Sequence, residues 1–373
     1  MRILRQRRED LLKAAKSKEI IIFGAGEMAL RLLNAVDIIS HVRFFCDCEK
    51  SRIGSRLCGI KVEEAERLKS IDPSEAVIVI ASGNHQKEMA EQALKFGDFD
   101  LYFAKVLVSE IFEHISCELF DNQEEIERAA QMLYDDISRN IYREVVKRRM
   151  LYGEADFSDL MIDGDEEYIF PRMFEDRAPS DEIIIDCGAY TGDTVELFNR
   201  EFGRNLKKIW ALECGRFQLA KLNDRVQRLG RLPYSPEIEI LPFAASDKEE
   251  KLEFYHTAVP NGAFVGASRT FAKNDKYNSE IYQVQAAPLD QLIPEGEPVT
   301  MIKMDIEGSE YAALCGAERI IRENKPKLAV AIYHSGVDFF RLIFLIKKMV
   351  PEYKIAVRHH KQRHVDTDVY AWI

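Results

Sequence analysis

A glycine turn at residues 186–194 carries the strongest chemical signal in the chain. Its sequence, DCGAYTGDT, places Gly188 and Gly192 where a strand would pass into a helix, so the backbone can approach a ligand closely. Glu213 follows 21 residues after Gly192, at the end of the next expected strand, where a carboxylate can accept hydrogen bonds from both ribose hydroxyls. The spacing departs from Gly-x-Gly-x-x-Gly and Asp186 precedes the turn, which favours S-adenosylmethionine (SAM), a nucleoside that bears an ammonium group. A purely structural turn is the alternative.

Charged residues gather at the end of a later expected strand, in the segment KMDIEG at residues 303–308. The period-2 alternation of a strand puts Lys303, Asp305 and Glu307 on one face. Because the carboxyl ends of strands form the ligand crevice of an open α/β sheet, these groups could orient SAM, take a substrate proton or hold a divalent cation. A structural ion pair at a strand end is the alternative interpretation.

His334 follows the next expected strand and has the side chain best suited to act as a base at neutral pH. A hydroxyl that accepts a methyl group needs a base or a metal ion to remove or polarise its proton. We therefore predict His334 or Asp305 as the base, with Lys303 stabilising charge or orienting Asp305. A Mg²⁺ ion held by Asp305 and Glu307 is an alternative, because hard oxygen ligands suit it. A core histidine without a catalytic role is the structural alternative.

A second glycine turn lies near the amino terminus. Gly24 and Gly26, followed by Ala29, come after the β-branched run at residues 19–23, and Asp47 ends the next expected strand, as in a dinucleotide-binding fingerprint. The stretch FCDCEKSRIGSRLCGIKV also resembles the second-strand region of Rossmann-like domains in sugar-nucleotide enzymes. We expect either a nucleotide or sugar-nucleotide ligand here, or a ligand-free scaffold.

Strands that alternate with helices predict a parallel α/β sheet in each half of the chain. Strands are expected at residues 19–23, 41–46, 76–81, 182–187, 206–212, 238–244, 300–304 and 327–333. Helices are expected at residues 124–150, 193–202, 216–229, 309–322 and 339–349. Strand pairs are expected at residues 252–256 with 282–286 and 353–357 with 369–372. The basic loop that begins at Arg358 and joins the second pair is expected to be solvated, and contact with an anionic substrate group is the alternative. The predicted domains are a Rossmann-like domain (1–105), a helical connector with an acidic segment (106–164) and a larger α/β domain (165–373).

Composition excludes several classes of protein. The 373 residues include 52 Lys and Arg against 63 Asp and Glu, and a net charge of −11 argues against a nucleic-acid partner. The seven cysteines form no CxxC pair, which disfavours a disulfide framework or a structural zinc site. Because no apolar run reaches about 18 residues and no signal peptide is evident, we expect a cytoplasmic protein without a membrane partner.

Several motifs together resemble the FkbM family of SAM-dependent methyltransferases. They occur in the family's order between residues 165 and 373: YIFPRMF, DCGAYTGDT, ALECGRFQLAKLN, FAASDKEEKLEFY, LDQLI, IKMDIEGSEYAALCGAERII, KPKLAVAIYH and a terminal RHH hairpin. One departure is Cys214-Gly215-Arg216, where relatives often carry a proline. The shape of that loop is therefore open, although Glu213 itself matches.

The resemblance implies a class I methyltransferase fold, a seven-stranded α/β sheet whose last strand is antiparallel. It also implies which residues bind SAM: Asp186, Gly188, Ala189, Tyr190 and Gly192 around the methionine, with Thr194 in the same turn, Glu213 at the ribose, and Ala245, Ser246 and Asp247 near the adenine. The expected activity is O-methylation of a hydroxyl on a sugar, glycan or related natural product. The alternatives are a non-catalytic SAM-binding or scaffold protein, and a nucleotide-sugar oxidoreductase or binding protein that uses the amino-terminal turn.

Overall fold

The chain folds into two compact units. The computed structural model describes residues 4–153, 155–162, 167–175, 181–259, 262–266 and 279–373. One unit comprises residues 1–126, 142–160 and 361–364, and the other comprises residues 127–141, 161–360 and 365–373. The expected connector is therefore divided between the two units, and residues 154 and 163–164 of it lie outside the described residues.

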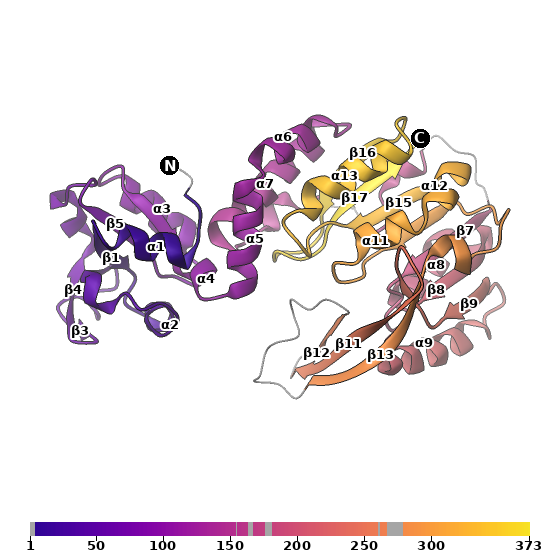
Figure 1. Ribbon diagram of the computed structural model, residues 1–373, viewed down its shortest axis with the longest axis horizontal. Helices are drawn as coiled ribbons and strands as arrows, with labels where there is room; N and C mark the ends of the chain where they lie inside the picture. Colours follow the sequence, from indigo (N-terminus) through magenta and orange to yellow (C-terminus); the bar gives the residue numbers. More distant parts are fainter. Residues whose placement is uncertain (1–3, 154, 163–166, 176–180, 260–261, 267–278) are drawn as a thin grey trace. The chain divides into compact units, whose positions relative to one another are not determined.

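A mainly parallel sheet with both faces buried forms the amino-terminal unit (Figure 1). Its elements are α1 (Arg8–Ala14), β1 (Glu19–Phe23), α2 (Glu27–Ala35), β2 (Val42–Asp47), β3 (Arg56–Leu57), β4 (Ile60–Glu64), β5 (Ala76–Ile80), α3 (Gln86–Leu94), β6 (Asp100–Phe103), α4 (Ala104–Leu107) and α5 (Glu110–Asp121). The strand order is β3-β4-β2-β1-β5-β6, with an antiparallel pair only between β3 and β4. Ile21 and Phe23 of β1 pack in one core and Ile20 and Ile22 in another. Burial on both faces explains the uninterrupted apolar runs of β1 and β5.

A seven-stranded sheet forms the centre of the second unit (Figure 1). Its strands are β7 (Glu182–Cys187), β8 (Leu206–Leu212), β9 (Glu237–Leu241), β14 (Met301–Met304), β15 (Lys327–Ala331), β16 (Lys354–His359) and β17 (Thr367–Trp372). Its helices are α8 (Asp193–Phe202), α9 (Arg216–Leu229), α10 (Leu289–Leu292), α11 (Glu310–Cys315), α12 (Glu318–Asn324) and α13 (Asp338–Met349). The strand order is β16-β17-β15-β14-β7-β8-β9, and β17 runs antiparallel to both of its neighbours. The predicted α/β class and the antiparallel last strand are confirmed.

A second, smaller sheet extends from the end of β9. It contains β10 (Ala244–Ala245), β11 (Glu250–Val259), β12 (Gly262–Gly266) and β13 (Ser279–Ala287), in the order β10-β13-β11-β12. The predicted pairing of residues 252–256 with 282–286 is confirmed, because β11 and β13 are antiparallel with Phe254 opposite Tyr282. Residues 260–261 and 267–278 of the intervening loop lie outside the described residues.

Two predicted helices are interrupted. The stretch 124–150 forms α6 (Gln123–Gln131) and α7 (Asp136–Tyr152), because the Asp135 carboxylate accepts the Ser138 amide at 2.7 Å and starts a new helix. The stretch 309–322 divides into α11 and α12 at Gly316. A Cβ on Gly316 would lie 2.0 Å from the carbonyl oxygen of Ser246, so this close contact requires glycine.

The basic carboxy-terminal cluster also differs from the expectation. Arg358 and His359, predicted in a solvated loop, are the last two residues of β16 and are only 3% and 2% exposed. Arg358 donates to the Ser138 hydroxyl at 2.8 Å, and the His359 Nδ1 lies 2.8 Å from the Thr367 hydroxyl. These side chains therefore belong to the interior of the unit. Within the described residues, no helix is both long and apolar enough to cross a membrane.

Candidate active site

The seven-stranded sheet has a cavity of about 310 Å³ at the carboxyl ends of β7, β8 and β14. β7 lies between β8 and β14, and the chain continues from β7 to β8 on one side and from β14 to β15 on the other. Open α/β sheets bind ligands at such a point, where the strand order reverses. The described residues that line the cavity are Glu167, Tyr168, Gly188, Tyr190, Asp193, Thr194, Leu212, Glu213, Cys214, Phe243, Ala244, Ala245, Phe254, Lys303, Asp305, Ile306, Glu307 and Ser309.

The glycine turn forms one wall of this cavity. Gly188 has a φ of +81°, and a Cβ there would lie 2.1 Å from the carbonyl oxygen of Asp305. The amides of Gly188 and Ala189 both donate to the Leu212 carbonyl, at 3.0 and 2.9 Å. Gly192, with a φ of +85°, is the residue from which α8 starts. Glycine at position 188 is thus required by the loop that carries Asp305.

Lys303 and Asp186 form a buried ion pair beneath the turn. The Lys303 Nζ lies 3.2 Å from Asp186 Oδ1 and donates to the carbonyl of Gly188 at 2.8 Å. The Thr194 hydroxyl donates to the other oxygen of Asp186. Burial alone would lower the pKa of Lys303, but Asp186 and Asp305 raise it above its ordinary value. Lys303 therefore stays charged and holds the glycine turn against β14.

Glu213 reaches the cavity from the end of β8. Its carboxylate accepts the amide of Tyr190 at 3.0 Å and the amide of Gly215 at 2.6 Å. Burial raises the pKa of this carboxyl to about 7, although both backbone donors act in the opposite direction. Each carboxylate oxygen keeps a lone pair beyond the one used, so Glu213 can accept further hydrogen bonds from a ligand.

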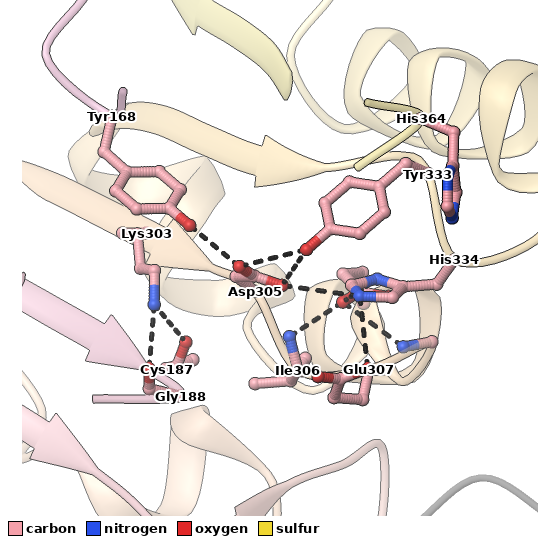
Figure 2. A network of polar contacts seen from close by, with 12 residues as sticks. Tyr168, Cys187, Gly188, Lys303, Asp305, Ile306, Glu307, Tyr333, His334 and His364 are labelled. Carbon is pink, nitrogen blue, oxygen red and sulfur yellow. Dashed lines mark hydrogen bonds and ion pairs between the residues drawn. The ribbon is translucent and has the colours of Figure 1, made fainter. Parts of the chain in front are cut away.

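Asp305, just beyond β14, is held by two tyrosines (Figure 2). The Tyr168 hydroxyl donates to Oδ2 at 2.8 Å and the Tyr333 hydroxyl donates to Oδ1 at 3.2 Å. Tyr168 has a φ of +66°, an uncommon conformation for a bulky residue, and its ring lies 5.0 Å from the Lys303 Nζ. The carboxylate is therefore fixed in orientation while it borders the cavity.

His334 lies against the same loop and its side chain is only 4% exposed. Its Nδ1 lies 3.1 Å from Glu310 Oε1, and its Nε2 lies 3.5 Å from both Asp305 Oδ1 and Glu307 Oε2. Burial alone would lower the pKa of the imidazole, but the carboxylates of Glu310, Glu307 and Asp305 raise it to about 10. With no other cation bound, the ring carries a proton at neutral pH and offsets the charge of the cluster.

The structure brings most of the predicted site residues to one cavity. Its lining includes the predicted residues Gly188, Tyr190, Thr194, Glu213, Ala245, Lys303, Asp305 and Glu307. The described lining does not include Asp186, Ala189, Gly192, Ser246, Asp247 or His334. Tyr168 begins the motif YIFPRMF, but the sequence did not predict it as a site residue. Its hydrogen bond to Asp305 spans 137 residues, and no local pattern marks such a contact.

Comparison with known proteins identifies this domain. The model of the methyltransferase FkbM domain matches residues 186–361, which contain the glycine turn, Glu213 and the Asp305 loop. Residues 186–361 are a methyltransferase FkbM domain. The expected family is thereby confirmed for the carboxy-terminal domain, which is a SAM-dependent methyltransferase domain by family and fold. A search of curated proteins found no matching sequence.

Solved structures agree with the fold of the FkbM domain. A crystal structure of methyltransferase FkbM from Methylobacillus flagellatus KT aligns with a TM-score of 0.61 and 21% identity, over 98% of this chain and 92% of that one. An rRNA methylase from Streptococcus thermophilus aligns at 0.30 and 15% identity, and Aeropyrum pernix fibrillarin, solved with bound SAM, at 0.32 and 13%. Each covers 52% of this chain, with 86% and 66% of the other chain covered, and scores this low add nothing to the assignment.

A second cavity, of about 860 Å³, lies in the amino-terminal unit at the carboxyl ends of β1, β2 and β5. Gly24, Gly26 and Asp47 all line it, so the three residues of the second motif meet there. The Asp47 carboxylate accepts the Ala25 amide at 2.8 Å and lies 3.2 Å from the Arg52 guanidinium. A Cβ on Gly24 would lie 2.4 Å from a carbonyl oxygen beyond β5, so packing already requires this glycine.

Proposed function

We propose that the FkbM domain transfers a methyl group from SAM to a hydroxyl of a sugar, glycan or related natural product. The observation that supports this reaction most directly is the Asp305 carboxylate, which borders the cavity beside Gly188 and Glu213. A carboxylate oriented by two hydroxyl donors is a suitable acceptor for the proton that a hydroxyl must lose. Glu307 and Ser309 also border the cavity, and their side chains can hydrogen-bond a compound with several hydroxyls.

The residues around the cavity suit SAM. Gly188 and Tyr190 border it with a backbone that leaves room for a ligand, and Glu213 offers free lone pairs for the ribose hydroxyls. Ala245 borders the cavity where the adenine is expected, whereas Asp186 acts from beneath the turn through Lys303. When bound, SAM supplies an electrophilic methyl group on a sulfonium ion.

Asp305 is a better candidate for the base than His334. The buried imidazole, with its pKa raised to about 10 by three carboxylates, already holds a proton at neutral pH and cannot take another. Asp305 is one of the carboxylates that border the cavity, and the hydroxyls of Tyr168 and Tyr333 fix its direction. In the transfer, the methyl carbon would exchange its bond to sulfur for a bond to the substrate oxygen, S-adenosylhomocysteine would leave, and the proton of that oxygen would pass to Asp305. Much of the rate then depends on how accurately the acceptor is positioned.

A radiolabel assay tests this proposal. The full chain is incubated with methyl-labelled SAM and separate panels of sugars, nucleotide sugars, phenols and amines, and product spectra locate the methyl group. We expect labelled methyl ethers, and Asp305→Asn should lower the rate by about 10²-fold or more while S-adenosylhomocysteine still binds. Asp224→Asn, which alters an exposed carboxylate on α9, is the matched control. Transfer to amines alone, or an unchanged rate in Asp305→Asn, would contradict the proposal.

The amino-terminal cavity supports a second, separate candidate function, the binding of a nucleotide or sugar nucleotide. Gly24, Gly26 and Asp47 border a cavity large enough for such a ligand. Calorimetric titration with NADH and with UDP-sugars, compared between the wild type and Asp47→Asn, tests it. A heat of binding that the wild type shows and Asp47→Asn does not would support a ligand. No heat of binding in either protein would favour a scaffold.

A further inference from the structure

Side chains with metal-binding chemistry meet where β14 and β15 end. The two strands are paired with Met304 opposite Val330, so the loops that follow them are neighbours. One loop carries Asp305 and the other carries His334. Ligand atoms of Asp305, His334 and Glu310 all lie within 4.8 Å of one another. Glu307 also approaches the imidazole (Figure 2).

The imidazole of His334 is buried, and its Nε2 has no well-aligned hydrogen bond. The side chain is only 4% exposed, Nδ1 is paired with Glu310, and Nε2 has no hydrogen-bond partner among the described residues. Nε2 points between two carboxylates, with Asp305 Oδ1 and Glu307 Oε2 each at 3.5 Å. Two ligand atoms about 2.1 Å from one metal ion are separated by roughly 3.0–3.5 Å at angles near 90–110°. The two 3.5 Å distances from Nε2 are longer than a good hydrogen bond and close to the separation of two atoms that bind the same metal ion.

Glu310 would orient the imidazole for binding a metal ion through Nε2. Its carboxylate is fully buried, accepts the amide of Ile306 at 2.8 Å and lies 3.1 Å from the Nδ1 of His334. A histidine that binds a metal through one nitrogen normally directs the other to a carboxylate or carbonyl. Glu310 therefore leaves Nε2 as the nitrogen that faces Asp305 and Glu307.

From this geometry we propose that His334, Asp305 and Glu307 bind one divalent transition-metal ion, such as Mn²⁺, at the edge of the cavity. Mg²⁺ prefers all-oxygen surroundings, whereas an imidazole nitrogen among carboxylates suits Mn²⁺, Fe²⁺, Co²⁺ or Zn²⁺. The nitrogen ligand thus distinguishes this site from the oxygen-only Mg²⁺ site that the sequence suggested.

The position of the ion would also serve the proposed reaction. Asp305 and Glu307 border the cavity, so an ion between them would face the acceptor and polarise its hydroxyl. If Asp305 binds the ion through Oδ1, its Oδ2, which accepts the hydrogen bond from Tyr168, remains as the proton acceptor. This role rests on the proposed function, but the binding of the ion does not.

Titration with MnCl₂ tests the site. The electron paramagnetic resonance signal of free Mn²⁺ is followed as the full chain is added, without SAM or an acceptor. We expect one bound equivalent, with Mn²⁺ bound at least about tenfold more tightly than Mg²⁺ in competition. Glu307→Gln and His334→Gln should each weaken binding by about tenfold or more. Because the side chain of Glu307 is 43% exposed, Glu307→Gln should fold even if His334→Gln does not.

His41→Gln, an exposed histidine outside the FkbM domain, is the matched control and should bind like the wild type. Absence of a bound equivalent, equal affinity for Mg²⁺, or unchanged binding in Glu307→Gln would overturn the inference. Methyl transfer without Mn²⁺ binding would contradict the metal site alone. Mn²⁺ binding without methyl transfer would contradict the proposed function alone.

Discussion

At the scale of single residues, Gly188 joins the glycine turn to the loop that carries Asp305. Two independent features require glycine here. The residue has a positive φ, and a Cβ would lie only 2.1 Å from the Asp305 carbonyl oxygen. The first concerns backbone conformation and the second concerns packing. The distance between the turn and the candidate base therefore depends on the absence of a side chain at this position.

Gly188→Ala and Gly296→Ala separate these two features. Gly296 has nearly the same φ, +82°, but has nothing within 4 Å of its Cβ position. We expect Gly296→Ala to cost about 1–2 kcal/mol from backbone strain alone. Gly188→Ala should cost more and should also weaken S-adenosylhomocysteine binding. Urea unfolding and calorimetry measure both effects, and equal losses of stability in the two variants would contradict this account.

Glu213 makes the stability of the FkbM domain depend on pH. Burial raises the pKa of this carboxyl from 4.5 in the unfolded chain to about 7 when folded, so the folded state binds the proton more tightly. This group's contribution to stability is therefore greatest below pH 4.5 and falls by about 3 kcal/mol as pH rises through 7. In Glu213→Gln, this part of the dependence of the unfolding free energy on pH should be absent. Urea unfolding at pH 5 and pH 8 measures it, and identical slopes in the two proteins would disprove the assignment.

At the scale of elements, α12 starts because of a residue that is distant in sequence. Ala317, the residue before α12, provides no capping side chain. The carboxylate of Asp290 instead accepts the amides of Arg319 at 2.7 Å and Ile320 at 3.1 Å. α10, which contains Asp290, therefore determines where α12 begins.

Removal of this cap should destabilise the protein. We expect Asp290→Ala to lower the free energy of unfolding by about 1–2 kcal/mol, because two amides at the start of α12 lose their acceptor. Asp290→Asn keeps one acceptor oxygen and should lose about half as much. Urea unfolding of both variants measures the difference. An equal loss of unfolding free energy in Asp290→Asn and Asp290→Ala would show that the charge of Asp290 matters rather than its capping hydrogen bonds.

At the scale of the whole chain, the unit that contains the FkbM domain includes residues 127–141. The amide of Tyr134 donates to Ile355 at 2.7 Å, and its ring packs against Trp372 with centroids 5.5 Å apart. Ser138 accepts a hydrogen bond from the buried Arg358. A domain that begins at residue 165 would therefore lack part of its own structure.

Truncation tests this boundary. A chain that begins at residue 127 should be more stable than one that begins at residue 165, by roughly 3–5 kcal/mol, because the shorter chain leaves the Arg358 charge without Ser138 and Asp135. Ser138→Ala in the full chain, which removes the hydroxyl but keeps Asp135 beside Arg358, should cost about 1–2 kcal/mol. Thermal and urea unfolding compare the three proteins. Equal stability of the two truncated chains would show that the domain does begin near residue 165.

Local patterns were sufficient for the strands and helices that surround the cavity. β7, β8, α8 and α9 begin and end at the predicted residues, because buried strands need continuous apolar runs and amphipathic helices need a 3.6-residue period. The interruptions at Asp135 and Gly316 were not predicted. One depends on a cap and the other on contact with Ser246, and periodicity contains neither signal.

The sequence alone determined the family, the sheet and the approach of Gly188, Glu213 and Asp305 to one cavity, because carboxyl ends of parallel strands share one edge of a sheet. Only the tertiary structure decided what each charged side chain contacts. It directs Lys303 to Asp186 and the glycine turn, Tyr168 to Asp305, and His334 into a group of carboxylates. These contacts join segments far apart in the chain, and the carboxylates around His334 keep its imidazole charged. Side-chain identity shows which reactions are possible, and packing selects among them.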